Sequence, residues 1–294
     1  MHDFWAFLDE QRIDDVRMAD AYERTGAQIR GLLKKNIAIH HELAEQRLPP
    51  KQKRTEISYG STLCAKASIP APWCLIVHDI SYPSAPRALA AAAPAQLSGL
   101  PLIWSVALYD KNTAAESDVA ALLHPHLLAA WELGGIENVA LIEKKAFLSR
   151  LRNFISSAEG DTGEGPGRAL LLGAPDFRDE LHLILNDERR ALVREEGVPP
   201  RILLTGNITE ANQSILSALH PDAGFEFLSG EGKAKDAAAN EVYDAVFYPA
   251  GENARADTPG APLCLDYEHS GCWFWPQLSA AFFLNHAISL NAKA

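Results

Sequence analysis

The sequence predicts an α/β protein in which mostly parallel sheets are covered by helices. An alanine-rich helix stops at Gly99 and is followed almost at once by an apolar strand, Leu102 to Leu108. Another apolar run, Trp73 to Val77, precedes this helix, and a helical pattern from about Ala115 to Leu133 follows the strand. Strands that alternate with helices in this way form parallel sheets, because each helix returns the chain to the start of the next strand.

Composition favours a folded, acidic protein of one or two domains. The 294 residues are 47% hydrophobic and carry a net charge of −11. This charge argues against nucleic acid and anionic membranes as partners, since both need a basic surface. Apolar stretches fall short of the roughly 20 residues of a membrane-spanning helix, and the first residues lack a basic segment leading into an apolar one. We therefore expect a cytoplasmic location.

The cysteines are predicted to be free, buried thiols, because they lie far apart without a C-x-x-C pair. They are Cys64, Cys74, Cys264 and Cys272. Cys272 lies between Gly271 and Trp273, where an aldehyde-oxidising nucleophile is one interpretation. An apolar, aromatic neighbourhood raises the pKa of a thiol, which favours an inert residue.

The N-terminal part is predicted to be helical and then extended. Apolar residues at helical spacing run from about Asp14 to Gln46. His40 and His41 are adjacent on this helix, about 100° apart, which predicts a surface role rather than a shared metal. The segment Glu56 to Cys64 alternates weakly and is predicted to be a strand or a hairpin arm.

Beyond Leu108 the alternation of helices and strands continues. Pro125 lies inside a helical pattern and marks a first turn or a kink, with His124 and His126 exposed; metal binding by these two histidines is the alternative. The glycines of Glu159 to Gly167 precede the strand Ala169 to Leu172 instead of following a strand, so this segment is predicted to be a surface loop and not a phosphate-binding loop.

The C-terminal third continues the same pattern. Asp176 is a plausible N-cap for a helix that runs to about Glu196. The helix Glu210 to His220 comes later in this part of the chain.

Several segments resemble, in order, the histidinol dehydrogenase family. Pro94 to Ile103 matches its Pro-Ala, two residues, Ala or Ser, Gly, aliphatic, two residues, Ile pattern without a gap. The segments Leu133 to Val139 and Val198 to Leu204 resemble later units of the family. Gly271 to Leu290 resembles its aromatic-Pro-Leu-Ser run and the helix that follows.

This resemblance implies two Rossmann-like domains with mostly parallel sheets, the fold of histidinol dehydrogenase and the aldehyde dehydrogenases. The first domain would be discontinuous, comprising residues 1–73 and 200–294. The second, nucleotide-binding-like domain would comprise residues 74–199, inserted between the two halves of the first.

The resemblance also implies NAD as cofactor, but the matching positions are altered. Asp79-Ile80 stands where the family has Gly-Gly, and Glu143 to Ala146 replaces its Gly-Gly-Ala-Gln. Asp176 stands where an Asn helps to hold the cofactor, and is the cofactor-binding residue implied here. An aspartate at such a turn would repel a pyrophosphate, and it lacks the close backbone approach that glycine allows.

Zinc is the second group that the resemblance implies. His220 matches one zinc ligand, Ser217 replaces the family's Gln ligand, and Asp257 falls at the third ligand position. Two protein ligands rarely hold zinc tightly, and His269 is a residue that could supply another. Taken alone, a histidine at the end of a helix is more often a cap than a ligand.

The predicted function is that of a divergent histidinol dehydrogenase-like protein that lacks histidinol oxidation and keeps a ligand cleft between its domains. The family's Glu-His acid/base segment has no match after Ser229, and neither does its C-terminal tail, so a homodimer of the family's kind is not expected and the oligomeric state stays open. One alternative is an NAD-dependent oxidoreductase for another small alcohol or aldehyde, with His220, Asp257 and His269 rebuilt into a site. Another is an interaction subunit that docks through Trp273 to Trp275.

Overall fold

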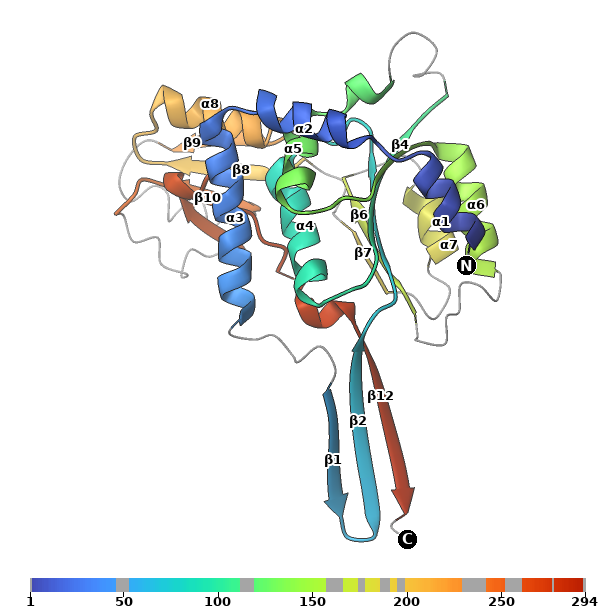
Figure 1. The fold of residues 1–294 in the computed structure, drawn as a ribbon. Coiled ribbons are helices and arrows are strands. Elements are labelled where there is room, and N and C mark those ends of the chain that lie inside the picture. The colour runs from blue at the N-terminus through green and yellow to red at the C-terminus, as the bar shows by residue number, and fades with distance from the viewer. Residues whose placement is uncertain are drawn as a thin grey trace.

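The computed structural model describes residues 2–45, 53–111, 119–156, 166–173, 178–185, 191–194, 199–228, 242–251, 261–276 and 278–292. Within these ranges the chain forms two parallel sheets and one antiparallel sheet, with helices packed on the parallel sheets (Figure 1). The predicted α/β class is confirmed. No helix in these ranges is both long and apolar enough to cross a membrane.

The larger parallel sheet has the strand order β5-β4-β3-β6-β7. Its central strand β3 pairs in parallel with β4 on one side and with β6 on the other, so the chain changes direction across the sheet between β3 and β6. Its strands are β3 (Cys74–Asp79), β4 (Ile103–Tyr109), β5 (Val139–Glu143), β6 (Arg168–Leu172) and β7 (Ala191–Arg194).

The smaller parallel sheet has the order β11-β10-β8-β9. Here the change of direction falls between β8 and β10, which pair with each other. Its strands are β8 (Arg201–Thr205), β9 (Gly224–Leu228), β10 (Ala245–Tyr248) and β11 (Leu263–Asp266). The helix α8 (Glu210–Leu219) connects β8 to β9.

Helices cover both faces of the larger sheet. Phe4 of α1 (His2–Glu10) packs with Phe147 of α6 (Lys144–Ser156) and Leu181 of α7 (Arg178–Leu185) on one face. On the other face, Met18 of α2 and Trp131 of α5 pack into the same core cluster as Ile76 of β3. The bounds of these two helices are Asp15–Arg24 and Pro125–Leu133.

The alanine-rich helix α4 (Ala85–Leu97) lies between the two parallel sheets (Figure 1). Every residue from Ala85 to Ala95 is buried. Ala92 packs into the core of the larger sheet, Ala90 into the core of the smaller sheet, and Leu89 against α3 (Ala27–Glu45). Methyl side chains allow this close approach from several sides. The predicted stop at Gly99 is confirmed, and Gly99 (φ +77°) adopts the left-handed conformation that glycine favours.

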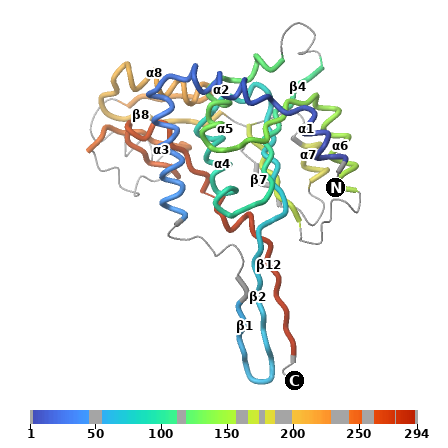
Figure 2. The backbone as a smooth tube through the Cα atoms, in the orientation of Figure 1, coloured from blue at the N-terminus to red at the C-terminus, as the bar shows by residue number. Residues whose placement is uncertain are grey.

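A three-stranded antiparallel sheet, here called the arm, projects from the body (Figures 1 and 2). It has the order β1-β2-β12, so a strand from near the C-terminal end of the chain completes a hairpin from near the start. Its strands are β1 (Lys53–Tyr59), β2 (Thr62–Pro70) and β12 (Leu284–Ala292). The segment Glu56 to Cys64, predicted to be a single strand or hairpin arm, instead contains the end of β1, the turn at residues 60–61 and the start of β2.

The base of the arm is held to β6 by one buried arginine, Arg168. Its guanidinium donates to five oxygen atoms at distances of 2.6–3.1 Å. The acceptors are the carbonyls of Pro166, Gly167, Phe282 and Leu284 and the side-chain oxygen of Asn285. A planar fork of N–H donors suits several carbonyls at once, which fixes the start of β12 against the larger sheet.

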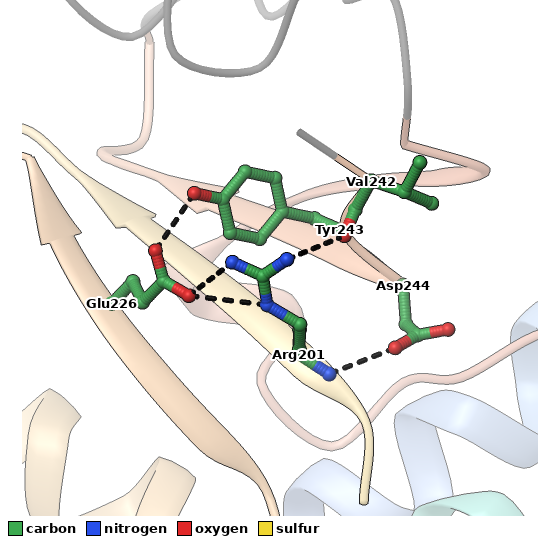
Figure 3. A network of polar contacts seen from close by, with 5 residues as sticks. All are labelled: Arg201, Glu226, Val242, Tyr243 and Asp244. Atoms are coloured by element: carbon green, nitrogen blue, oxygen red, sulfur yellow. Dashed lines mark hydrogen bonds and ion pairs between the residues drawn. The ribbon is translucent and has the colours of Figure 1, made fainter. Parts of the chain in front are cut away.

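A polar network ties the strands of the smaller sheet together at the edge where β8 begins (Figure 3). The Arg201 guanidinium donates to the Glu226 carboxylate at 2.5 Å and lies 4.8 Å from the centre of the Tyr243 ring. The Tyr243 hydroxyl donates to Glu226 at 2.8 Å, and the Arg201 N–H donates to Asp244 at 2.8 Å. Hydrogen bonds from Arg201 and Tyr243 lower the pKa of Glu226, so the network favours its ionised form.

Four expected helices differ from the structure. The helix predicted from about Ala115 to Leu133 is, among its described residues, a 3₁₀ turn at Val119–Leu122 and then α5, which begins only at Pro125. The helix predicted for Asp14 to Gln46 is two helices, because the Thr25 hydroxyl caps the end of α2 by donating to the Ala21 carbonyl. The helix predicted to reach Glu196 is interrupted, since Ala191–Arg194 is strand β7. The helix expected after the aromatic-Pro-Leu-Ser run is a short 3₁₀ turn followed by β12.

The predicted surface role of His40 is also wrong. His40 is buried, and its Nε2 lies 3.0 Å from the Trp273 carbonyl oxygen. The two histidines do point in different directions on α3, and His40 faces inward because α3 packs against the segment that contains Trp273. The division into domains 1–73 with 200–294 and 74–199 stays a prediction.

We expect Arg168→Ala to lower the free energy of unfolding by about 2–4 kcal/mol, because five buried or half-buried acceptors lose their donor. Hydrogen exchange should rise first in β12. Arg152→Ala, which removes an exposed ion pair with Glu180, is the control and should change stability by less than about 0.5 kcal/mol. Urea unfolding measures both; equal effects would contradict the role given to Arg168.

Candidate functional site

A pocket of about 620 Å³ lies at the carboxyl edge of the smaller sheet. Asn207 follows β8, Pro249 follows β10 and Glu268 follows β11, and all three line it. The helices α3 and α8 form the rest of the wall. The pocket therefore lies where the order of a parallel sheet changes direction between β8 and β10, the position at which open α/β sheets generally bind ligands.

The pocket combines an apolar wall with a small set of polar groups. Leu32 and Ile215 supply apolar surface from α3 and α8. Lys35 and Glu268 supply one positive and one negative side chain, and the Lys35 amino group also donates to the Glu268 carbonyl at 3.3 Å. Side-chain amides complete the polar set, and they belong to Gln28, Asn207 and Asn212.

Tyr267 fixes the strand ends that form the pocket wall. It is buried, and its hydroxyl donates to the Thr205 carbonyl at 2.8 Å. The Thr205 hydroxyl in turn donates to the Phe247 carbonyl at 3.1 Å. These two bonds connect β11, β8 and β10, so the wall is held by rigid elements rather than by loop packing.

A histidine–aspartate pair lies beside the pocket. His269 Nδ1 is 2.5 Å from Asp266 Oδ1, and the intervening residues Tyr267 and Glu268 line the cavity. Donation from Nδ1 to a carboxylate leaves Nε2 as the acceptor in the neutral ring, so the pair is suited to accept a proton.

Cys272 lies a few residues beyond this pair and does not act with it as a reactive thiol. Its side chain is buried, and desolvation raises its pKa to about 12. A thiol in this environment stays protonated and is a poor nucleophile. The predicted inert thiol is confirmed for Cys272.

His220 is a buried structural residue at the end of α8. Its Nε2 donates to the Ser270 carbonyl at 3.1 Å, and its ring lies 5.4 Å from the ring of Trp273. Desolvation, followed by the charge of Arg87, lowers its pKa to about 4. The ring is therefore neutral, and its Nε2 proton ties α8 to the segment after β11.

Of the two residues predicted to bind zinc, His220 and Asp257, the structure describes only His220. Ser217 is exposed whereas His220 is fully buried, and no group of three His, Cys, Asp or Glu side chains suited to a metal occurs among the described residues. His269 pairs with Asp266. Asp257 lies outside the described residues, so its predicted role stays a prediction.

The edge at which a dinucleotide would bind is closed by protein. A pyrophosphate binds at the free N-terminus of the helix after the first strand, which here is α4. The Ser84 hydroxyl donates to the Leu219 carbonyl, and Arg87 forms an ion pair with Asp222, so the end of α8 covers this terminus. Proline at its start also removes one N–H donor.

The remaining residues at this edge do not offer a cradle for a pyrophosphate either. The Asp79 carboxylate accepts from the N–H and the hydroxyl of Ser81, at 2.8 Å and 2.6 Å, and forms a closed turn. The residues present therefore do not fit NAD at this position. Asp176 lies outside the described residues and its implied role stays a prediction.

The aromatic run Trp273 to Trp275 packs inside the chain. Trp273 is buried, Phe274 lies 4.5 Å from the His40 ring, and the Trp275 indole donates to the Arg87 carbonyl at 3.1 Å. The latter two side chains are half-buried. The three rings do not form an exposed docking patch.

Sequence reasoning missed most of the pocket. A position immediately after a parallel strand is a signal that could have found Asn207 and Glu268. Gln28 and Lys35 carry no comparable signal, because only the packing of α3 brings them to the sheet edge.

No protein-family model and no curated protein matches this sequence. Solved structures do. Histidinol dehydrogenase from Elizabethkingia anophelis is similar with a TM-score of 0.55 and 11% identity, over 96% of this chain and 77% of that one. Succinate-semialdehyde dehydrogenase from Burkholderia pseudomallei has a TM-score of 0.48 and 9% identity, over 98% and 88%. An aldehyde dehydrogenase from Brucella melitensis biovar abortus 2308 has a TM-score of 0.46 and 8% identity, over 95% of this chain and 83% of that one.

The first of these similarities confirms the expected fold, that of a dehydrogenase with parallel α/β units. At 11% identity it concerns the fold alone, and it does not single out histidinol oxidation. Activity has to be argued from the site.

His78 and His220, the two most deeply buried of the described histidines, predict a pH dependence of stability. Desolvation lowers the pKa of His78 to about 4, as it does that of His220, whereas the unfolded chain takes up a proton near 6.5. Between these values the unfolded state binds more protons, so stability falls as the pH falls. From pH 7 to pH 5 we expect a loss of roughly 2 kcal/mol for each histidine.

Urea unfolding at the two pH values measures this loss. His220→Asn should reduce it by roughly 2 kcal/mol, and replacement of the exposed His41 by Asn should leave it unchanged. Equal pH dependence in the wild type and both variants would contradict the assignment.

Proposed function

We propose that this chain is a small-molecule-binding protein built on a dehydrogenase fold, and that it does not oxidise histidinol. The observation that carries the proposal is the pocket at the carboxyl edge of the smaller sheet, with a wall fixed by Tyr267. A volume of about 620 Å³ is in the range of sites for small metabolites.

The lining supports a polar ligand that carries an anionic group. Lys35 is the cation available to that group, and Asn207 and Asn212 offer amide donors from the opposite wall. Glu268 would accept from a hydroxyl or an amino group elsewhere on the ligand. Leu32 and Ile215 would pack against its apolar part.

Loss of histidinol oxidation is supported by the covered start of α4 and the engaged ring of His220. The ligand site that we propose lies at one sheet edge instead of in a cleft between the two predicted domains. A cytoplasmic location and the absence of a nucleic-acid partner belong to the same proposal, on the grounds of charge and composition.

An NAD-dependent oxidoreductase for another small alcohol or aldehyde is the second candidate. The pair formed by His269 and Asp266 favours it, because a base beside the pocket could accept the proton of a bound hydroxyl group. This candidate needs a dinucleotide site other than the one that α8 covers.

A thermal-shift titration checks the first proposal. NAD, NADP, zinc and histidinol should leave the melting temperature unchanged. One or more carboxylate- or phosphate-bearing metabolites should raise it. A ligand at a concentration of 100 times its dissociation constant stabilises the folded chain by about 2.7 kcal/mol. Lys35→Met should abolish that shift, and Lys34→Met on the outer face of α3 should preserve it. If the melting temperature still rises in Lys35→Met, the ligand binds outside this pocket, which would contradict the proposal.

An activity screen separates the two candidates. We expect no reduction of NAD with histidinol or with a panel of small alcohols and aldehydes. Turnover that is lost in His269→Asn and retained in His126→Asn would establish the oxidoreductase in place of the binding protein.

A further inference from the structure

One wall of the pocket contains a glycine in the middle of a helix. Gly31 lies in the interior of α3, and no other helix among the described residues contains a glycine. Glycine weakens a helix, because it loses more backbone freedom on folding than any other residue. Its presence in α3 therefore calls for a local reason.

Neither backbone conformation nor close packing supplies that reason. Gly31 does not have a positive φ, and a Cβ added to it would meet no atom within 4 Å beyond its own helix backbone. At Gly271, by contrast, an added Cβ would lie 2.7 Å from Leu32 Cβ, so close contact with α3 explains that glycine. Gly31 instead lines the pocket. Glycine at such a position lets a ligand approach the backbone closely.

The two charged side chains among the lining residues meet at one end of the pocket. They are Lys35 and Glu268, and the Lys35 amino group lies 3.3 Å from the Glu268 carbonyl oxygen. Their opposite charges cancel, which disfavours a ligand group with two negative charges, such as a phosphate ester. They suit a group that itself carries both signs, as the carboxylate and ammonium of an α-amino acid do.

We propose that the pocket binds an α-amino acid with an aromatic side chain, and that Gly31 determines this specificity by leaving room for the ring. The proposal rests on the small-molecule-binding function proposed above. Lys35 binds the carboxylate, and Glu268 accepts from the ammonium group. Gly31 is four residues from Lys35, about 6 Å along the axis of α3, so a ring joined to the α-carbon by one methylene group lies over the bare backbone.

The rest of the lining favours a ring that has a polar atom. Leu32 and Ile215 offer apolar contacts to the faces and edges of a ring. Asn207 and Asn212 carry amides that can pair with a ring hydroxyl or a ring N–H. Tyrosine and tryptophan have such a group, whereas leucine has none. We therefore expect tyrosine and tryptophan to bind more tightly than leucine.

Calorimetric titration of the whole chain with these three amino acids tests the proposal. Tyrosine and tryptophan should bind at least about tenfold more tightly than leucine. Gly31→Ala should weaken binding of both by about tenfold, because the added methyl group takes up space that the ring needs. The same substitution should raise the melting temperature of the free chain, since alanine is the better helix former. A purely structural role of Gly31 would change the stability alone.

A matched control separates helix stability from the shape of the pocket. Ser214 is exposed in the interior of α8 and does not line the pocket. Ser214→Ala should raise the melting temperature and leave the affinity for tyrosine unchanged.

The deaminated analogue of tyrosine tests the role of Glu268. The wild type should bind tyrosine at least about tenfold more tightly than this analogue, which has no ammonium group. Glu268→Gln should lose most of that preference, because the neutral amide does not attract the ammonium charge.

The outcomes distinguish this proposal from the function on which it rests. Binding of a different carboxylate or of a phosphate ester in the pocket, without binding of tyrosine or tryptophan, would overturn the amino acid proposal and keep the small-molecule-binding function. Tyrosine binding that Gly31→Ala leaves unchanged would overturn the role of Gly31. A chain that binds none of these compounds would overturn both proposals.

Discussion

The structure depends on how closely two sheets can approach a single helix. α4 has no exposed side, and its run of methyl side chains lets it contact the larger sheet, the smaller sheet and α3 at once. Asn36 of α3 donates to the Pro86 carbonyl at 3.1 Å, and Leu33 packs beside Leu89. Because α3 is fixed in this way, Lys35 reaches the edge of the smaller sheet. The same packing places the end of α8 over the start of α4, so the features that form the pocket also close the dinucleotide edge.

Elements with strong local signals could be predicted from the sequence. The helix that stops at Gly99 and the strand after it carry their boundaries in nearby residues, and both occur in the structure. β12 could not be predicted in this way, because its strand state depends on pairing with β2, far away in the sequence. The break between α2 and α3 depends on a single cap at Thr25, which interrupts a continuous apolar pattern without altering it.

The site was less accessible to sequence reasoning than the fold. The sequence predicts that His220 ends a helix, which is confirmed. Its packing against Trp273 and its hydrogen bond to Ser270 could not be predicted, because both partners lie far away in the sequence. The pair formed by Asp266 and His269 spans one short turn, yet its relation to a cavity becomes visible only when α3 and α8 are in place. Similarity in fold to an enzyme therefore says where ligands bind in such sheets, whereas the chemistry depends on side chains that distant segments bring together.

The strand order of the arm has a consequence for synthesis of the chain on the ribosome. β1 and β2 emerge early and can form their hairpin at once, but β2 gains its second neighbour only when residues more than two hundred positions later have been made. Closing so long a loop is slow, and it comes after both parallel sheets can assemble. Throughout that interval the side of β2 that will receive β12 is an open edge, carrying Leu63 and Cys64. The hairpin of the nascent chain is thus open to mispairing along this edge until β12 has been made.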